Sequence, residues 1–381
     1  MVAATLQTAN PTAGTVSRQP QTTGNPTASA SAPFVRASRG MQILGPSQVG
    51  QAYGTLWTPS IKPVGGYLRY LNLIVTSVTG GTLTGASLAA DAPYNAIQNL
   101  FLRDPYGQPI IQADGYSLFL INAYGGQSGM LGFGNNPSAE PSWTAASATT
   151  GAFQFTLDVP LEMDSAAYCA LPAMNAASQP QVQLQWNPST VVFGAHTGTD
   201  PTLTSTLNEP FWGAPVENPQ LAPPDVGSSA QWSVARAAAT VASGAFQRIV
   251  LPRVGTFIHT LILVLRDSTG ARIDQWPVSD LTLWADGVPL KMEFFSERAD
   301  AMFKQFGVTR PTGVIVYTFR DSVQSAVSTA DTYDLLFPTT PATLLEISGT
   351  FGVISNAPAT IQVITGELYP LAGIPFSHLA Q

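Results

Sequence analysis

The segment YLRYLNLIV at residues 67–75 places Leu71, Leu73 and Val75 at every second position. Successive side chains of a β-strand point to opposite faces, so this alternation predicts a strand with one buried face. Runs of the same kind recur at residues 153–159, 181–186 and 359–364, and Gly, Pro, Asn and Asp separate them. Many short strands bounded by turn residues predict an all-β sandwich or barrel of antiparallel strands.

The pattern occurs twice along the chain. The alternation of residues 71–75 returns at residues 261–265, 190 positions later. Residues 100–110 and 281–290 share an L-x-L strand, a turn that carries Asp and Gly, and a Pro that starts the next strand. A repeat of this length is too long for a solenoid and suits a duplicated domain. We therefore expect two tandem eight-stranded jelly-roll sandwiches.

Each copy then contains a segment with helical character, at Tyr116–Tyr124 and at Phe294–Phe306. In the second segment the apolar residues fall on one helical face and the charged residues lie elsewhere. Strands resume at residues 153–159 and 314–319. We expect a short helix in each sandwich.

Composition divides the chain into five parts. Residues 1–40 are rich in Thr, Ala, Ser, Gln and Pro, so they cannot bury enough surface to offset their ordering entropy and are expected to form a flexible N-terminal arm. A Pro-rich stretch at 210–229 cannot be a central strand, because Pro lacks a backbone donor. It is the predicted linker between a first jelly roll at 41–209 and a second at 230–370, and residues 371–381 form a tail.

Charge is scarce and unevenly spread over the 381 residues. Charged residues make up 10% of the chain and the net charge is −7, which argues against nucleic-acid binding. The arm, by contrast, carries Arg18, Arg36 and Arg39 and no acidic residue. These three arginines are candidates for a weak, salt-sensitive contact with phosphate groups, at an inner face or a membrane.

The remaining features point to a chain made in the cytoplasm and without a cofactor. Cys169 is the only cysteine, so neither a disulfide framework nor a cysteine-based zinc site is expected within one chain. The first residues show neither the basic nor the apolar region of a secretory signal, and no apolar run approaches the roughly 18 residues that span a bilayer.

Catalytic motifs are not apparent. His196, His259 and His378 are scattered; we expect His259 to be hydrogen-bonded within a sheet and the other two to be solvated. Cys169 is expected to be a small core filler rather than a nucleophile. The chain is therefore expected not to be an enzyme.

The carboxylates Asp158, Glu162 and Asp164 could form a pair for glycoside hydrolysis. They flank Pro160 at the end of a predicted strand, where acidic residues usually solvate a turn. The structural interpretation is preferred.

A resemblance rests on a set of ordered segments. A Pro-, Gln- and Thr-rich arm precedes a strand near Tyr53–Trp57, and the run AIQNLFLRDPYGQ at 96–108 leads into the helix-like Asp114–Asn122. The segment VPL at 159–161 and the strand Val182–Trp186 follow. Over most of residues 41–370 the chain resembles the double jelly-roll major capsid proteins of tectivirus-type bacteriophages, which are related to the adenovirus hexon.

The resemblance implies a viral structural protein of the virion shell. It implies a homotrimer that forms a pseudo-hexagonal capsomer of an icosahedral capsid over an internal lipid membrane. The implied partners are neighbouring capsomers, penton or minor capsid proteins and the internal membrane, with no specific nucleic acid. A low content of charge fits such an assembly, because unpaired buried charges are unfavourable.

Two other functions stay open. One is a two-domain jelly-roll carbohydrate-binding or surface protein, in which exposed Trp143, Trp212 and Trp276 would stack on sugars. The other is a glycan-processing enzyme on two jelly rolls that would use the acidic cluster at 158–164.

Overall fold

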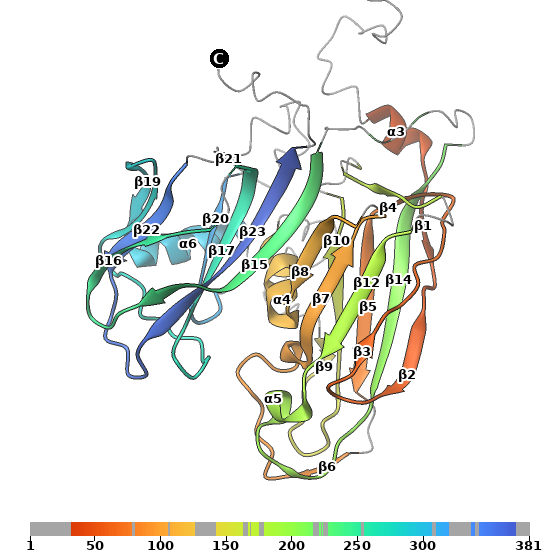
Figure 1. The fold of residues 1–381 in the computed structure, drawn as a ribbon, viewed down its shortest axis with the longest axis horizontal. Coiled ribbons are helices and arrows are strands. Elements are labelled where there is room, and N and C mark those ends of the chain that lie inside the picture. The colour runs from red at the N-terminus through yellow and green to blue at the C-terminus, as the bar shows by residue number, and fades with distance from the viewer. Residues whose placement is uncertain are drawn as a thin grey trace, which may run out of the picture.

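The computed structural model describes residues 32–370 apart from 78–80, 106, 126–141, 163–166, 168, 175–178, 216–220, 222, 224–227, 253–254, 307–309, 320–336 and 340–342. The described residues form two β-sandwiches that lie next to each other (Figure 1). The predicted all-β fold of two tandem jelly rolls is confirmed.

The first sandwich has a sheet around β5 and a facing sheet around β7. The first of these sheets contains β1 (Gly40–Ile43), β2 (Ser47–Gln51), β4 (Gly66–Leu68), β5 (Tyr70–Ser77), β9 (Ser142–Thr144), β10 (Phe153–Pro160), β11 (Leu171–Pro172) and β14 (Leu203–Gly213). The facing strands are β3 (Leu56–Trp57), β7 (Ile97–Arg103), β8 (Pro109–Ala113) and β12 (Gln181–Trp186), and β6 (Thr82–Thr84) pairs separately with β13 (Thr197–Thr199). Leu71, Leu73 and Val75 of β5 share one buried core with Leu100 and Leu102 of β7, as the alternation predicts.

The second sandwich has the same two-layer design. One layer consists of β15 (Ser228–Val241), β17 (Phe257–Arg266), β20 (Val314–Thr318), β21 (Phe337–Pro338) and β23 (Ala359–Pro370). The other consists of β16 (Phe246–Val250), β18 (Leu281–Ala285), β19 (Val288–Glu293) and β22 (Leu345–Thr350). Leu261, Leu263 and Leu265 of β17 pack with Leu281 and Leu283 of β18 in a second buried core.

The order of the strands is the same in both sandwiches. In the first, β1 and β2 pair with β14, then follow β5 and β10; in the second, β15 pairs with β23, then follow β17 and β20. The facing layers run β3-β12-β7-β8 and β16-β22-β18-β19. Thus β8 corresponds to β19, and β1 with β2 corresponds to β15. The predicted duplication of one sandwich is confirmed.

Both predicted helices are present and occupy corresponding places. The helix α4 (Gly115–Tyr124) follows β8, and α6 (Phe295–Phe306) follows β19. Asp114 caps α4, since its side chain accepts a hydrogen bond from the Ser117 amide at 2.8 Å. The other helices described are α3 (Ala32–Ala37), α5 (Ser189–Phe193) and the 3₁₀ turn η1 (Tyr94–Ala96).

The expected linker differs from the structure at both ends. Residues 210–213 belong to β14 and residues 228–229 belong to β15. Pro210 is accommodated because β14 changes partners there: its pairing with β5 ends at Asn208, and its pairing with β4 starts at Phe211. The Pro210 carbonyl still accepts a hydrogen bond from the Arg69 amide at 3.0 Å. The other domain limits stay predictions.

The expected flexible arm also differs in its last part. Residues 32–37 form α3, and Phe34 is fully buried with its ring edge-on to Tyr67 at 5.5 Å between centroids. This segment therefore belongs to the fold of the first sandwich. Residues 1–31 and the predicted tail at 371–381 lie outside the described residues.

Candidate functional site

The junction between the sandwiches brings together strands, a helix and charged side chains from both halves of the chain. Strand β8 of the first sandwich pairs in parallel with β15 of the second, with Ile111 opposite Trp232 and Gln112 opposite Ser233. This pairing joins strands of both sandwiches into one nine-stranded sheet. The two halves are thus linked by backbone hydrogen bonds as well as by side chains.

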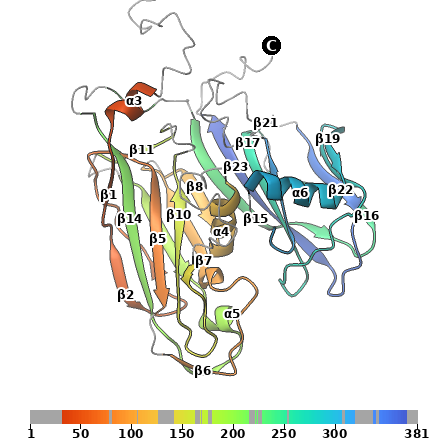
Figure 2. The ribbon, with the colours of Figure 1, turned by 180° about the vertical axis from the view of Figure 1, so that it is seen from behind.

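Apolar side chains fill the rest of the junction. The helix α4 lies between the two sandwiches, next to α6 (Figure 2). The ring of Tyr124 in α4 meets Phe306 of α6 edge-on, with 5.0 Å between centroids. Ile262 and Val264 of β17 are fully buried in the same cluster as the apolar residues of α4. Strand β17 is therefore covered on both faces: by its own sandwich on one and by the junction on the other.

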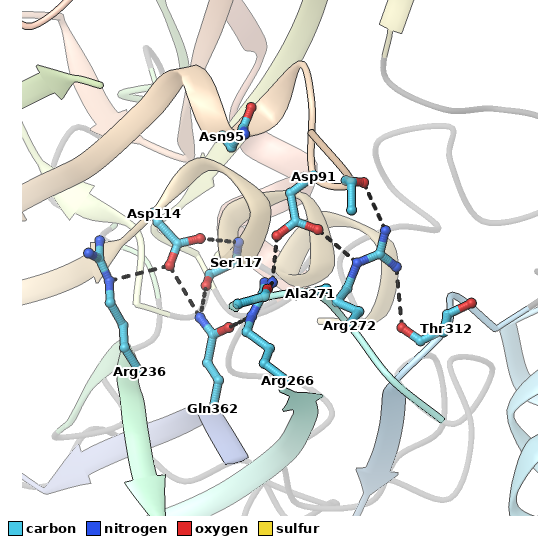
Figure 3. Close-up of polar contacts among 12 residues, drawn as sticks. Asp91, Asn95, Asp114, Ser117, Arg236, Arg266, Ala271, Arg272, Thr312 and Gln362 are labelled. Carbon is cyan, nitrogen blue, oxygen red and sulfur yellow. Dashed lines mark hydrogen bonds and ion pairs between the residues drawn. The ribbon is translucent and has the colours of Figure 1, made fainter. Parts of the chain in front are cut away.

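A carboxylate at the rim of the junction binds two arginines of the other sandwich (Figure 3). Asp91 precedes η1, and its Oδ1 accepts a hydrogen bond from Arg272 Nε at 2.7 Å. Its Oδ2 lies 2.7 Å from Arg266 Nη1. Arg272 Nη2 also donates to the Ala90 carbonyl at 3.0 Å. All three charged side chains are largely buried, which strengthens their attraction.

Gln362 of β23 extends this network to the start of α4. Its Oε1 accepts a hydrogen bond from Arg266 Nε at 3.0 Å, and its Nε2 donates to Ser117 Oγ at 2.8 Å and to Asp114 Oδ2 at 3.2 Å. Arg236 of β15 reaches the same carboxylate, with Nε 3.5 Å from Asp114 Oδ2 (Figure 3). The side-chain amide of Gln362 thus connects the helix cap Asp114 with Arg266, which binds Asp91.

Tyr116 lies beneath the two arginines. The guanidinium carbons of Arg272 and Arg266 are 4.7 and 5.5 Å from the centre of its ring, within the range of cation–π attraction. Burial raises the pKa of its hydroxyl far above the usual value. The whole arrangement acts as a clamp that fixes the angle between the sandwiches. No local sequence pattern marks its residues, because Asp91 and Arg272 are 181 positions apart and Asp114 and Gln362 are 248 positions apart.

The histidines do not form a site. The ring of His259 is buried, with Nδ1 3.0 Å from Thr260 Oγ1 and its edge against Trp232, so the expected sheet histidine is confirmed. His196 was expected to be solvated, but its ring is held between the Gly194 carbonyl at 2.8 Å and Asp200 at 2.7 Å. The hydrogen bond to Asp200 raises its pKa. His378 lies outside the described residues.

Asp158 does not solvate a turn, contrary to expectation. It lies within β10 and is buried, and its Oδ1 accepts a hydrogen bond from Asn72 Nδ2 at 2.7 Å. Burial raises the pKa of its carboxyl to about 6, and the hydrogen bond from Asn72 opposes part of that rise. Asn122 of α4 bonds to both the amide and the carbonyl of Asp158, at 2.7 Å each. Its contacts are those of a structural residue.

Glu162 is also buried rather than exposed at a turn. It pairs with Arg69 at 2.9 Å and accepts a hydrogen bond from Trp212 Nε1 at 2.8 Å. Asp164 lies outside the described residues. Both carboxylates that the structure describes are therefore engaged with protein groups, and the acidic cluster offers no support for glycoside hydrolysis.

The tryptophans do not form a sugar-binding platform either. Trp276 was expected to be exposed, but it is fully buried against Phe351 and donates to the Gly313 carbonyl at 3.1 Å. Trp212 is half-buried beneath the guanidinium of Arg69, which lies 4.3 Å from its ring. The side chain of Trp143 lies outside the described part of the structure.

A groove of about 840 Å³ runs over the outer face of β7, β8 and β12 beside β15. Its lining is rich in amides and includes Leu56, Gln98, Asn99, Phe101, Arg103, Gln112, Ala113, Gln183, Gln185, Val234 and Arg236. The one aromatic ring in this lining, that of Phe101, has the Arg103 guanidinium 4.3 Å above it. A sugar ring would have to displace that arginine to stack there.

Among the described residues, no group of three or more His, Cys, Asp or Glu side chains could hold a metal ion. Cys169 is half-buried. In that same part of the chain, no helix combines the length and the apolar character needed to cross a bilayer.

The structure describes two of the three arginines of the arm. Arg36 of α3 and Arg39 are exposed, and Arg18 lies outside the described residues. Their contact with an inner face or a membrane stays a prediction.

The strand order, the paired sandwiches and the helix in each define the double jelly-roll fold. The chain superposes on the STIV MCP, from Sulfolobus turreted icosahedral virus, with a TM-score of 0.63 at 13% identity over 88% of this chain and 100% of that one. It superposes on the major capsid protein P2 from bacteriophage PM2 with a TM-score of 0.51 at 11% identity, over 88% of this chain and 100% of that one. On the PBCV-1 virus capsid the TM-score is 0.55 at 13% identity, over 87% of this chain and 93% of that one. No protein-family model and no curated protein matches the sequence.

These similarities confirm, at the level of the fold, the resemblance read from the sequence. The shared feature is the double jelly roll of major capsid proteins.

Proposed function

We propose that this chain is a major capsid protein, and that three copies form a pseudo-hexagonal capsomer of an icosahedral virus shell. The observation that carries the proposal is the identical strand order of two sandwiches joined rigidly side by side. Three such chains around a threefold axis present six similar walls, and closed cyclic symmetry is a common basis for stable oligomers. The structural neighbours named as capsid proteins support the same role.

The proposal extends to the surroundings of the shell. Helix α3 and the end of β23 lie at the same end of the molecule (Figures 1 and 2), so the first and last described residues lie at one face. We place this face inward, where Arg18, Arg36 and Arg39 would meet an internal membrane or neighbouring capsomers. Penton or minor capsid proteins are further proposed partners. The role is structural and involves no enzymatic step.

The decisive experiment images the purified full-length chain by negative stain and measures its mass by light scattering. Trimers with a hexagonal outline, or shells built from them, are expected. Elongated monomers at high concentration would refute the proposal, and monomers that bind glycans would favour the carbohydrate-binding alternative.

A further inference from the structure

The junction inside one chain supplies a template for a contact between chains. Strand β8 is the last strand of its layer, and its free edge is covered by β15, the first strand of the next sandwich. An uncovered strand edge exposes a row of backbone donors and acceptors that can pair with another strand. Inside the chain, β15 of the second sandwich pairs with this edge of the first.

The corresponding edge of the second sandwich is open. Strand β19 ends the order β16-β22-β18-β19, and no described strand pairs with its outer edge. At the other end of the molecule, β1 pairs on one side with β14 and, among the described residues, with no strand on its outer side. Strand β19 and strand β1 lie at opposite sides of the molecule in both views (Figures 1 and 2). One chain therefore carries both halves of a head-to-tail contact.

The register identifies the residues of β19 that would take part. Leu102 of β7 is opposite Ile111, and Leu283 of β18 is opposite Lys291. Since β7 corresponds to β18, Lys291 holds the place of Ile111. By the same step, Met292 holds the place of Gln112.

The register of the last strands identifies the residues of β1. Trp232 is opposite Gly366 of β23, and Gly366 is opposite Thr260 of β17. In the first sandwich Gln42 is opposite Pro210 of β14, which lies between the residues of β14 that pair with β5 and those that pair with β4. Gln42 therefore holds the place of Trp232, and Ile43 holds the place of Ser233.

Exposed apolar side chains surround both edges. On the β19 side, Val288, Met292, Phe294 and Phe303 are each more than half exposed, with Met292 at 69%. On the β1 side, Leu44 and Val49 are 74% and 75% exposed. The helix α4, which lies within the junction inside the chain, is buried along nearly its whole length, whereas α6 keeps an open face at Phe303. The apolar groups that a second copy would cover are thus present and uncovered.

We propose that β19 of one copy pairs in parallel with β1 of the next copy, with Lys291 opposite Gln42 and Met292 opposite Ile43. The proposal rests on the proposed trimer and specifies its interface. The contact is head-to-tail, so it closes into a ring when the rotation between copies sums to a full turn. Three copies then contain three junctions inside chains and three between chains, all built on the same strand pairing.

Paired cysteines test this register. A chain with Cys169→Ala, Gln42→Cys and Lys291→Cys carries both halves of the contact, and facing residues of paired strands lie within the Cα separation of roughly 4.4–6.8 Å that a disulfide requires. The matched control moves one cysteine along the same edge, as Gln48→Cys with Lys291→Cys. Gln48 is also an exposed glutamine, but it is opposite Ser205 of β14 rather than Pro210, and five residues of that strand displace it by about 17 Å. Circular dichroism establishes that each variant is folded.

After mild oxidation, we expect the Gln42→Cys variant to lose its monomer band on a non-reducing gel. Bands at twice and three times the chain mass should replace it, and the Gln48→Cys variant should stay monomeric on the same gel. Equal cross-linking of both variants, or of neither, in a chain that is trimeric by light scattering overturns the strand pairing and leaves the proposed function intact. A wild-type chain that stays monomeric overturns both.

Discussion

Replacing Asp91 by Asn tests the clamp between the two sandwiches. The substitution keeps the size of the side chain and removes the charge that joins Arg266 and Arg272. In the variant, two guanidinium groups would lie close together over the ring of Tyr116 without the carboxylate between them. The like charges would then repel one another.

The size of the effect follows from what the arginines retain. Removing one partner of a buried ion pair costs about 3–5 kcal/mol, and a hydrogen bond to a charged group contributes about 1.5–3 kcal/mol. Arg266 keeps the Gly270 carbonyl and Gln362, and Arg272 keeps the Ala90 and Thr312 carbonyls. Because neither arginine loses all its acceptors, we expect a loss of about 2–4 kcal/mol in the free energy of unfolding.

Urea unfolding and thermal melting measure this loss. At roughly 2–4 °C per kcal/mol for a domain of this size, the Tm should fall by about 4–16 °C. The control is Asp300→Asn, which breaks the exposed pair with Lys304 on α6 and should cost no more than about 0.5 kcal/mol. If Asp91→Asn is no more harmful than Asp300→Asn, the clamp does not hold the sandwiches together and the reasoning is refuted.

Three further predictions concern buried groups. Because the folded-state pKa of Asp158 is about 6 and its ordinary value is 3.8, the folded chain binds more protons between these values. Its stability should therefore fall by roughly 3 kcal/mol as the pH rises through that window. Urea unfolding at pH 4.5 and 7.5 should show a smaller loss of unfolding free energy in Asp158→Asn than in the wild-type chain. An equal loss in both would contradict the buried carboxyl. Glu162→Gln loses the charge that pairs with Arg69 and should lower the unfolding free energy by about 2–3 kcal/mol; an unchanged urea midpoint would speak against a structural role. Phe306→Ala removes the ring that meets Tyr124 and should cost about 3–5 kcal/mol in the same assay; a loss below 1 kcal/mol would show that the helices do not support each other.

The fold could be predicted because strand periodicity is a local signal and the duplication repeats it in order. Leu71, Leu73 and Val75 show the buried face of β5 directly, and the corresponding leucines of β17 repeat it. The helix α6 was predicted from its single apolar face. Even α4, which is buried nearly all round, was indicated by its position in the repeat.

The junction could not be predicted, because it depends on contacts between residues far apart in the sequence. Asp91 and Arg272 have no local pattern that marks them as partners. Trp276 was expected to be exposed, and only the fold shows that it fills the second core. Phe34 is the only aromatic residue in the first 40 residues, so sequence composition gave no sign of its burial against Tyr67.

The parallel pairing of β8 with β15 also has a mechanical consequence. Domains within a chain usually rock against each other unless their interface is large and apolar. Here a hinge motion would have to break backbone hydrogen bonds of a continuous sheet and separate α4 from β17. The pairing therefore opposes a hinge between the two sandwiches, and in the proposed shell any curvature would be taken up along the boundaries between molecules rather than within them.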